Sequence, residues 1–258
     1  MGKTTTAVNL AASLAAAEQR TLLIDADPQG NATSGVGLQK ENVPLSLYDV
    51  LVGNSDLRSS RQTGVQFEKL DVVGATPDLA AAEVELVDRG DRDHVMRDAV
   101  QSLRADYDFV IIDCPPSLGL ITINMLAAAD ALLIPLQCEY YALEGLSQLL
   151  ATISLVREHL NPHLEIDGVV LTMFDGRTNL SSEVANEVRA HLADRVYETV
   201  IPRNVKLSEA PSHGLPIHAY APESRGAAAY QALAVEFRAR FPKTPSDTAH
   251  PGAAVLVA

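Results

Sequence analysis

Short runs of apolar residues alternate along the chain with longer stretches whose apolar positions recur at helical spacing. Residues 109–112 and 131–134 are apolar at every position rather than at every second one. Strands of that kind are buried on both faces, as in a parallel sheet with a helical layer on either side. The pattern therefore predicts an α/β protein with a doubly wound, mostly parallel sheet flanked by helices.

The predicted elements cover most of the chain. The predicted strands are residues 21–26, 70–75, 109–114, 131–137, 166–174 and 198–202. The predicted helices are residues 5–18, 79–88, 93–104, 143–159, 181–193 and 224–241. Residues 42–63 are more polar, and we expect a surface excursion there with a short helix near residues 46–52. We expect one domain over residues 1–241 and, because three prolines lie among small residues beyond it, a disordered tail over residues 242–258.

The composition is ordinary for a globular protein, with 47% hydrophobic and 21% charged residues. The net charge of -13 argues against general coating of nucleic acid, although it leaves room for a local basic patch. No apolar run approaches the roughly 20 residues that a membrane span needs. The two cysteines, Cys114 and Cys138, lack metal-ligand spacing and lie in or next to apolar runs. They are predicted to be buried thiols of a cytoplasmic protein.

Gly2, Lys3, Thr4 and Thr5 form the second half of a phosphate-binding loop. In such a loop backbone N–H groups surround the phosphates, a lysine reaches the β- and γ-phosphates, and a hydroxyl holds Mg²⁺. A helix that follows directly adds its positive end at the same anion. Alone, Gly-Lys-Thr is weak evidence, because the triplet also begins ordinary helices.

Acidic residues end two of the predicted buried strands. Asp25 and Asp27 close the first strand, and Asp113 closes the strand at 109–114. Ligands of open α/β sheets gather at the carboxyl ends of strands, and a carboxylate there can hold Mg²⁺. One such aspartate could equally form a turn or cap a helix. Three of them downstream of Gly-Lys-Thr favour a site for magnesium and a triphosphate.

Four further blocks of the sequence are distinctive: DADPQGNAT from Asp25, IDCPPSLG from Ile112, QCEYYALEG from Gln137 and IPRNVKLSEAPS from Ile201. Together they resemble the ParA and Soj branch of the deviant Walker partitioning ATPases. They stand in the family's order, and the match runs from Gly2 to about residue 241. The resemblance implies a P-loop ATPase that forms an ATP-dependent homodimer, binds DNA non-specifically at the nucleoid and partitions chromosomes or plasmids. It also implies a ParB-like partner that stimulates hydrolysis.

The phosphate-binding loop departs from the family's pattern, which reads Lys-Gly-Gly-Val-Gly-Lys-Thr-Thr. Met1 stands at the valine, so the first lysine, two glycines and the first strand are missing. We expect the natural start to lie upstream, with Met1 at a GTG codon. Without that strand we expect exposed strand edges in the middle of the sheet. Without the first lysine we expect impaired ATP hydrolysis.

The resemblance implies a role for each residue of the phosphate and magnesium site. Gly2 belongs to the phosphate loop, and Lys3 contacts the β- and γ-phosphates as a catalytic residue. Thr4 ligates Mg²⁺ and Thr5 binds the α-phosphate. Two acids complete the site: Asp27 positions the attacking water as the catalytic acid, and Asp113 holds the Mg²⁺ shell. Asp25 is expected to be a local electrostatic support.

The resemblance also implies contacts to the base and to DNA. Pro202, Arg203 and Asn204 are expected to contact the adenine, near Met173. Arg177 and Lys206 match family positions that contact DNA phosphates, and Arg225 is a weaker candidate for such a contact. A lone surface lysine or arginine is more often a solvated charge, so any DNA-binding patch must be local and depend on the dimer.

Three other functions compete with partitioning. A MinD-like membrane-associated ATPase needs a basic amphipathic C-terminal helix, whereas residues 242–258 carry prolines and only Lys243 and His250 as cations. An iron–sulfur reductase needs a cysteine pair across a dimer axis, which Cys114 and Cys138 do not fit. A non-catalytic nucleotide-binding protein remains open, because part of the loop is absent.

Overall fold

The computed structural model describes residues 2–139, 142–241 and 252–258. Within these ranges the strands form one sheet in the order β2-β3-β1-β4-β7-β5-β6, in which only the edge pair of β2 and β3 is antiparallel. The predicted doubly wound, mostly parallel sheet is confirmed. The strands are β1 Thr21–Asp25, β2 Arg61–Gln62, β3 Leu70–Val73, β4 Phe109–Asp113, β5 Ala131–Gln137, β6 Glu165–Thr172 and β7 Ala253–Val257.

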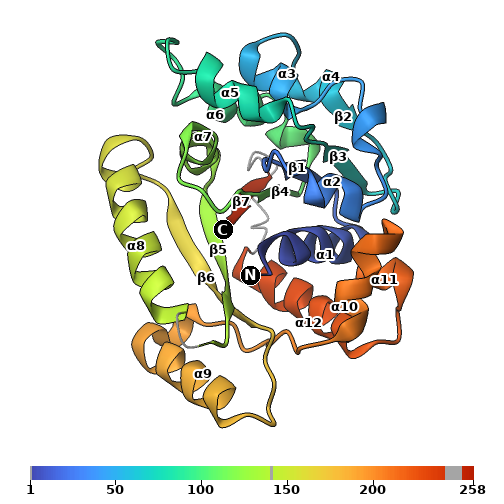
Figure 1. The fold of residues 1–258 in the computed structure, drawn as a ribbon, viewed down its shortest axis with the longest axis vertical. Coiled ribbons are helices and arrows are strands. Elements are labelled where there is room, and N and C mark those ends of the chain that lie inside the picture. The colour runs from blue at the N-terminus through green and yellow to red at the C-terminus, as the bar shows by residue number, and fades with distance from the viewer. Residues whose placement is uncertain (1, 140–141, 242–251) are drawn as a thin grey trace.

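Helices cover both faces of the sheet, and each face has its own apolar core (Figure 1). On one face the core includes residues of α1 Lys3–Ala16, α10 Val205–Glu209, α11 Ile217–Tyr220 and α12 Arg225–Arg240. On the other face it includes residues of α3 Leu47–Val52, α4 Leu57–Ser60, α5 Leu79–Glu85, α6 Val95–Gln101, α7 Leu120–Ala128, α8 Ala142–His159 and α9 Asn179–Leu192. The short α2 Asn31–Gly35 follows β1. None of the helices described here is long and apolar enough to cross a bilayer.

The C-terminal residues differ most from expectation. We expected a disordered tail over 242–258, but residues 253–257 form β7, which pairs in parallel with β4 on one side and β5 on the other. Residues 242–251 lie outside the described ranges. The expected exposed edges in the middle of the sheet are absent from the described residues, because β7 fills the gap between β4 and β5. The disordered tail was predicted from three prolines among small residues. The last residues, Ala-Ala-Val-Leu-Val, are nevertheless apolar enough to form a strand that is buried on both faces.

Residues 198–202 do not form the predicted strand. Tyr197 and Ile201 do donate backbone hydrogen bonds to β6, at 2.9 and 2.8 Å. Between them, however, the backbone N–H groups of Glu198 and Thr199 donate to the carboxylate of Glu236 on α12, at 2.8 and 2.9 Å. The Glu236 side chain thus takes backbone donors that pairing with a neighbouring strand would need. Beyond the end of β6 only an isolated bridge between Phe174 and Pro202 is found in the described chain.

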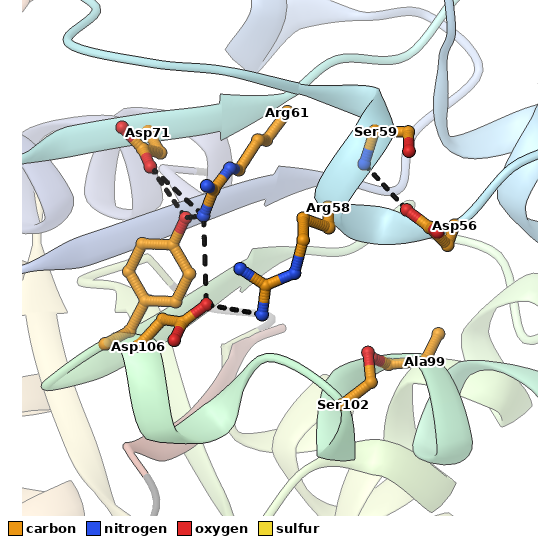
Figure 2. Close-up of polar contacts among 9 residues, drawn as sticks. Asp56, Arg58, Ser59, Arg61, Asp71, Ala99, Ser102 and Asp106 are labelled. Atoms are coloured by element: carbon orange, nitrogen blue, oxygen red, sulfur yellow. Dashed lines mark hydrogen bonds and ion pairs between the residues drawn. The ribbon is translucent and has the colours of Figure 1, made fainter.

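A polar cluster fixes the edge of the sheet where β4 begins. Tyr107 donates a hydrogen bond to Asp71 of β3 at 2.6 Å and accepts one from Arg61 of β2 at 3.0 Å. Asp106 pairs with Arg58 at 2.7 Å and lies 4.0 Å from Arg61 (Figure 2). These contacts anchor the 3-10 turn Arg104–Asp106 against β2, β3 and α4.

Candidate functional site

The phosphate-loop residues stand at the start of α1. Gly2 precedes the helix with a φ of 129°, in the region that favours glycine, and a Cβ there would lie 3.2 Å from the Thr172 hydroxyl oxygen. Lys3, Thr4 and Thr5 form the first turn, where backbone N–H groups lack intrahelical partners and the positive end of the helix dipole is strongest. The sequence therefore places a glycine, a cation and two hydroxyls at a helix end suited to an anion.

The acids predicted to face this helix end lie side by side on the sheet. Asp25 and Asp113 are the last residues of β1 and β4 and are register partners. Asp25 is fully buried and accepts hydrogen bonds from the backbone N–H and the hydroxyl of Thr33, both at 2.7 Å, and from the backbone of Asp27 at 3.2 Å. Burial raises the pKa of Asp25 to about 6, against the lowering effect of Thr33. Its oxygens are thus occupied by protein donors, as the expected supporting role requires.

Asp113 is also fully buried, but neither of its carboxylate oxygens accepts a hydrogen bond from the described residues. Burial raises its pKa well above the ordinary value, and the neighbouring carboxylates of Asp25 and Asp27 raise it further. The hydroxyl of Thr4 and the charge of Lys3 act in the opposite direction. Lys3, Thr4 and Asp27 therefore all act on the charge of this one buried carboxylate. A buried carboxylate without donors is costly unless a cation neutralises it.

The donors at this position suit Mg²⁺. Magnesium binds one or two protein oxygens and completes its octahedron with water and phosphate oxygens. The oxygens of Asp113 and Thr4 match that pattern, and Lys3 adds a charge for the phosphates. No group of three or more histidine, cysteine or acidic side chains that could hold a metal occurs among the described residues. A cation here would therefore depend on oxygens that a phosphate brings.

Asp27 lies half-buried just beyond β1. Its Oδ1 accepts a hydrogen bond from the backbone of Gln29 at 2.9 Å, and its backbone carbonyl accepts one from Gly30 at 2.8 Å. The turn holds the carboxylate near Asp113 while leaving it in contact with solvent. That position suits a group that orients a water molecule.

A cavity of ≈ 400 Å³ lies next to Gly2. Gly2, Thr5 and Pro202, three of the residues expected to bind the nucleotide, line this cavity. Arg203 and Asn204 are not among its lining residues. The Asn204 side chain instead accepts a hydrogen bond from the backbone of Lys206 at 2.8 Å and caps α10. The complete lining is Gly2, Thr5, Gln137, Thr172, Met173, Ile201, Pro202, Leu207, Ser208, Pro211 and Tyr230.

Sequence reasoning missed Thr172 in this cavity. The residue is buried, and its hydroxyl has no hydrogen-bond partner among the described residues. A buried hydroxyl of this kind is expected to meet a ligand or a water molecule. The available signal was its place at the carboxyl end of β6, but the strand predicted over 166–174 ran past it.

The basic residues expected to contact DNA lie on neighbouring segments. Arg177 is 88% exposed and pairs with Asp175 through two hydrogen bonds of 2.8 and 2.7 Å, which lower the pKa of Asp175 to about 2. Lys206 pairs with Glu209 at 2.8 Å. Arg225 is exposed at the start of α12, next to Gly226, which packs against α10. Arg177 and Lys206 are thus held by acids rather than presented as free charges.

Both cysteines are free and buried, as predicted. Burial raises the pKa of the Cys114 thiol to about 12 and that of Cys138 to about 11. Neither thiol is therefore ionised near neutral pH.

Comparison with known proteins agrees with this geometry. A family model described as an AAA domain matches residues 1–166. The chain is 54% identical over 246 residues to the chromosome partitioning protein ParA of Myxococcus xanthus, covering 95% of this chain and 87% of that protein. It is 56% identical over 239 residues to the sporulation initiation inhibitor protein Soj of Bacillus subtilis, covering 93% and 94%. Among solved structures it resembles cobyrinic acid a,c-diamide synthase of Mycobacterium smegmatis with a bound ATP analogue and magnesium, at a TM-score of 0.78 and 36% identity over 91% of this chain and 88% of that one.

Proposed function

The chain belongs to the ParA and Soj family of chromosome-partitioning ATPases, and on that premise we propose that it is an ATP-driven switch that partitions DNA. Its ligands are ATP and Mg²⁺. Its ATP-bound form is a homodimer that binds DNA without sequence preference, and hydrolysis to ADP and phosphate returns it to the free state. Such a cycle is a switch because the ATP-bound and ADP-bound forms bind DNA with different affinities.

One observation carries the proposal: the buried carboxylate of Asp113, for which no hydrogen bond of normal geometry is found among the described residues, lies beside Thr4 and Lys3 at the start of α1. A buried acid without partners needs a cation, and the adjacent helix end needs an anion. A magnesium–triphosphate supplies both. An ATP analogue and magnesium are bound in the related synthase structure.

Each residue then has a physical task. Lys3 neutralises the β- and γ-phosphates, Thr4 and Asp113 hold Mg²⁺, and the first turn of α1, with Gly2 and Thr5, binds the remaining phosphate oxygens. Asp27 orients the attacking water from the turn after β1. When bound, Mg²⁺ screens the charge that develops on the transferred phosphoryl group.

The cavity lined by Pro202 and Thr5 suits the nucleoside. Pro202 and Met173 provide flat apolar surface for a base. Arg203 and Asn204 follow Pro202 directly, so we propose that they contact the base from the rim through their backbone. The Asn204 side chain is already engaged in capping α10.

We propose that Arg177, Lys206 and Arg225 contact DNA phosphates. Arg177 and Lys206 must then leave their ion pairs with Asp175 and Glu209, or share their charge between the carboxylate and DNA. Binding DNA therefore costs part of the ion-pair energy. That cost, together with a net charge of -13, favours binding only when a dimer doubles the number of contacts.

The remaining parts of the cycle follow from the family. We propose that a ParB-like protein stimulates hydrolysis, and that the protein acts in the cytoplasm at the nucleoid.

Binding of a random-sequence DNA duplex, followed by fluorescence anisotropy with ATP–Mg²⁺, with ADP–Mg²⁺ and without nucleotide, tests the proposal. We expect binding with ATP–Mg²⁺ to be at least tenfold tighter than in the other two states, and to weaken steeply with salt. Arg177→Ala and Lys206→Ala should each weaken it, whereas Lys69→Ala, which removes a surface lysine paired with Glu68, should not. Equal binding in all three nucleotide states would contradict the switch.

A further inference from the structure

The loop that follows Asp113 connects the end of β4 to the start of α7 and spans residues 114–119. Two of its residues, Pro115 and Pro116, have no backbone N–H group and so cannot donate hydrogen bonds that would fix the loop. Its second half is held from α7, because the Thr122 hydroxyl donates to the carbonyl of Ser117 at 2.5 Å. The position of this loop therefore depends on how the start of α7 is fixed.

The start of α7 is capped by a side chain from another helix. The Oε2 atom of Glu83 on α5 accepts a hydrogen bond from the backbone N–H of Leu120 at 2.8 Å, and its Oε1 atom accepts one from Ile121 at 3.3 Å. Figure 1 shows α5 next to α7. The first N–H groups of a helix have no partner within it, and a negative charge there is favourable. Glu83 thus supplies the cap that Gly119, at the N-cap position, cannot provide.

Gly119 has no room for a side chain because of this contact. A Cβ there would lie 2.2 Å from Oε1 of Glu83, closer than real Cβ atoms come. The φ of Gly119 is -91°, which any residue can adopt, so its backbone conformation does not require glycine. The close approach of the Glu83 carboxylate to the backbone is what excludes a side chain at this position.

The packing of α5 fixes where Glu83 stands. Leu79, Ala82 and Leu86 of this segment are fully buried in the core that α7 also joins, and Glu83 is half-buried beside them. Glu85, two residues further along, accepts a hydrogen bond from the Tyr48 hydroxyl on α3 at 2.9 Å. The two glutamates of α5 therefore hold different neighbours, and only Glu83 contacts the segment that follows Asp113.

We propose that Glu83 is a positioning residue of the magnesium site, which caps α7 and thereby fixes the loop that begins directly after Asp113. This inference rests on the proposed magnesium–triphosphate site. Neither oxygen of the Asp113 carboxylate has a hydrogen bond of normal geometry in the described chain, so its direction depends on the main chain on either side. The sheet fixes one side, where the backbone of Ala26 donates to the carbonyl of Asp113 at 2.9 Å. Glu83 fixes the other side through α7.

The location of Glu83 separates its effect from that of the phosphate-binding residues. Lys3 and the first turn of α1 act on the phosphates, whereas Glu83 bonds to backbone groups of α7 and acts only through the loop that carries Asp113. Loss of Glu83 should therefore weaken the part of ATP binding that depends on Mg²⁺. The affinity for ATP without Mg²⁺ should stay as it is.

Calorimetric titration of ATP with and without Mg²⁺ tests the inference on the whole chain. The quantity compared is the ratio of the two dissociation constants, and we expect Glu83→Ala to reduce the gain from Mg²⁺ by about fivefold or more, given the usual cost of losing a charged cap. Glu85→Ala is the matched control, because it removes an acid of the same helix that bonds to α3, and it should leave the gain unchanged.

The possible outcomes separate this inference from the proposed function. A Glu83→Ala variant that keeps the full gain from Mg²⁺ would overturn the inference, even if urea unfolding shows that the variant is less stable. A wild-type chain without any gain would overturn the magnesium site and the inference together. If Glu83→Ala does not fold, Glu83→Gln replaces it, since it keeps one acceptor oxygen, and an undiminished gain in that variant would also overturn the inference.

Gly119→Ala tests the same contact from the other side. Its Cβ should push the Glu83 carboxylate off the helix end and reduce the gain from Mg²⁺ as Glu83→Ala does, whereas Gly90→Ala, where a Cβ meets open space, should have no effect. In the double variant Glu83→Ala and Gly119→Ala the second change should add nothing, because the contact is already lost. Effects that multiply in the double variant would overturn the inference.

Discussion

Shortening Leu256 to alanine measures whether the C-terminal strand carries part of the fold. Leu256 is 0% exposed and lies between Ile112 of β4 and Leu132 of β5 as their register partner. A buried leucine replaced by alanine costs about 2–5 kcal/mol, depending on how far the surroundings collapse. Paired strands on both sides restrict that collapse, so we expect the upper half of this range. Native domains have only about 5–15 kcal/mol in total, so the loss is large.

The assay is equilibrium unfolding in urea, followed by circular dichroism. Leu256→Ala should shift the midpoint strongly at an unchanged slope. Leu155→Ala is the matched control, because it removes the same atoms from a side chain that is 61% exposed on α8, and it should change the free energy of unfolding by less than about 0.5 kcal/mol. If the two variants unfold at the same urea concentration, the C-terminal segment is not in the sheet and the reasoning is refuted.

Two further predictions concern the nucleotide site. The pKa of Asp25 is raised from 3.8 to about 6, so the folded protein keeps a proton that the unfolded chain has released, and the free energy of unfolding should fall as pH rises from about 4 to about 6. At about 1.4 kcal/mol per pKa unit, the loss in the free energy of unfolding should reach the order of 3 kcal/mol. Urea unfolding of the nucleotide-free protein at a series of pH values measures it, and Asp25→Asn should show a flatter dependence of stability on pH than the wild type. A free energy of unfolding that rises over this pH range would contradict the burial argument. Thr172→Val removes a hydroxyl that has no hydrogen-bond partner in the described part of the chain, so the free energy of unfolding should change by less than about 0.5 kcal/mol while fluorescent-ATP binding weakens. Unchanged ATP affinity would show that this hydroxyl does not meet the ligand.

Local patterns in the sequence were sufficient for most of the sheet. Buried parallel strands have continuous apolar runs, which is why the predicted strand 131–137 matches β5 and why Asp25 and Asp113 could be predicted at the ends of two strands. The register that brings those two acids together could not be read from the chain, because pairing depends on the twist and order of the whole sheet.

Other features depended on partners far away in sequence. The helix α7 was missed because its residues are buried on all sides, which removes the amphipathic period. In the segment at 198–202 two backbone N–H groups bond to Glu236 instead of to a neighbouring strand, and the C-terminal apolar residues form β7 by pairing with β4 and β5. Asn204 is a local case: the resemblance assigned it to the base, whereas its side chain accepts a hydrogen bond from the backbone of Lys206, two residues on, and caps α10.

The most direct test of the account is isothermal titration calorimetry of ATP with and without Mg²⁺, on the wild-type chain, on Asp113→Asn and on Asp194→Asn as an exposed control. The account predicts that Mg²⁺ tightens ATP binding at least tenfold in the wild type and in Asp194→Asn, because the cation joins the phosphates to the buried carboxylate of Asp113. It predicts no such effect in Asp113→Asn. An Asp113→Asn variant that keeps the full effect of Mg²⁺ would contradict the claim that this carboxylate, with Lys3 and Thr4, forms the magnesium–triphosphate site.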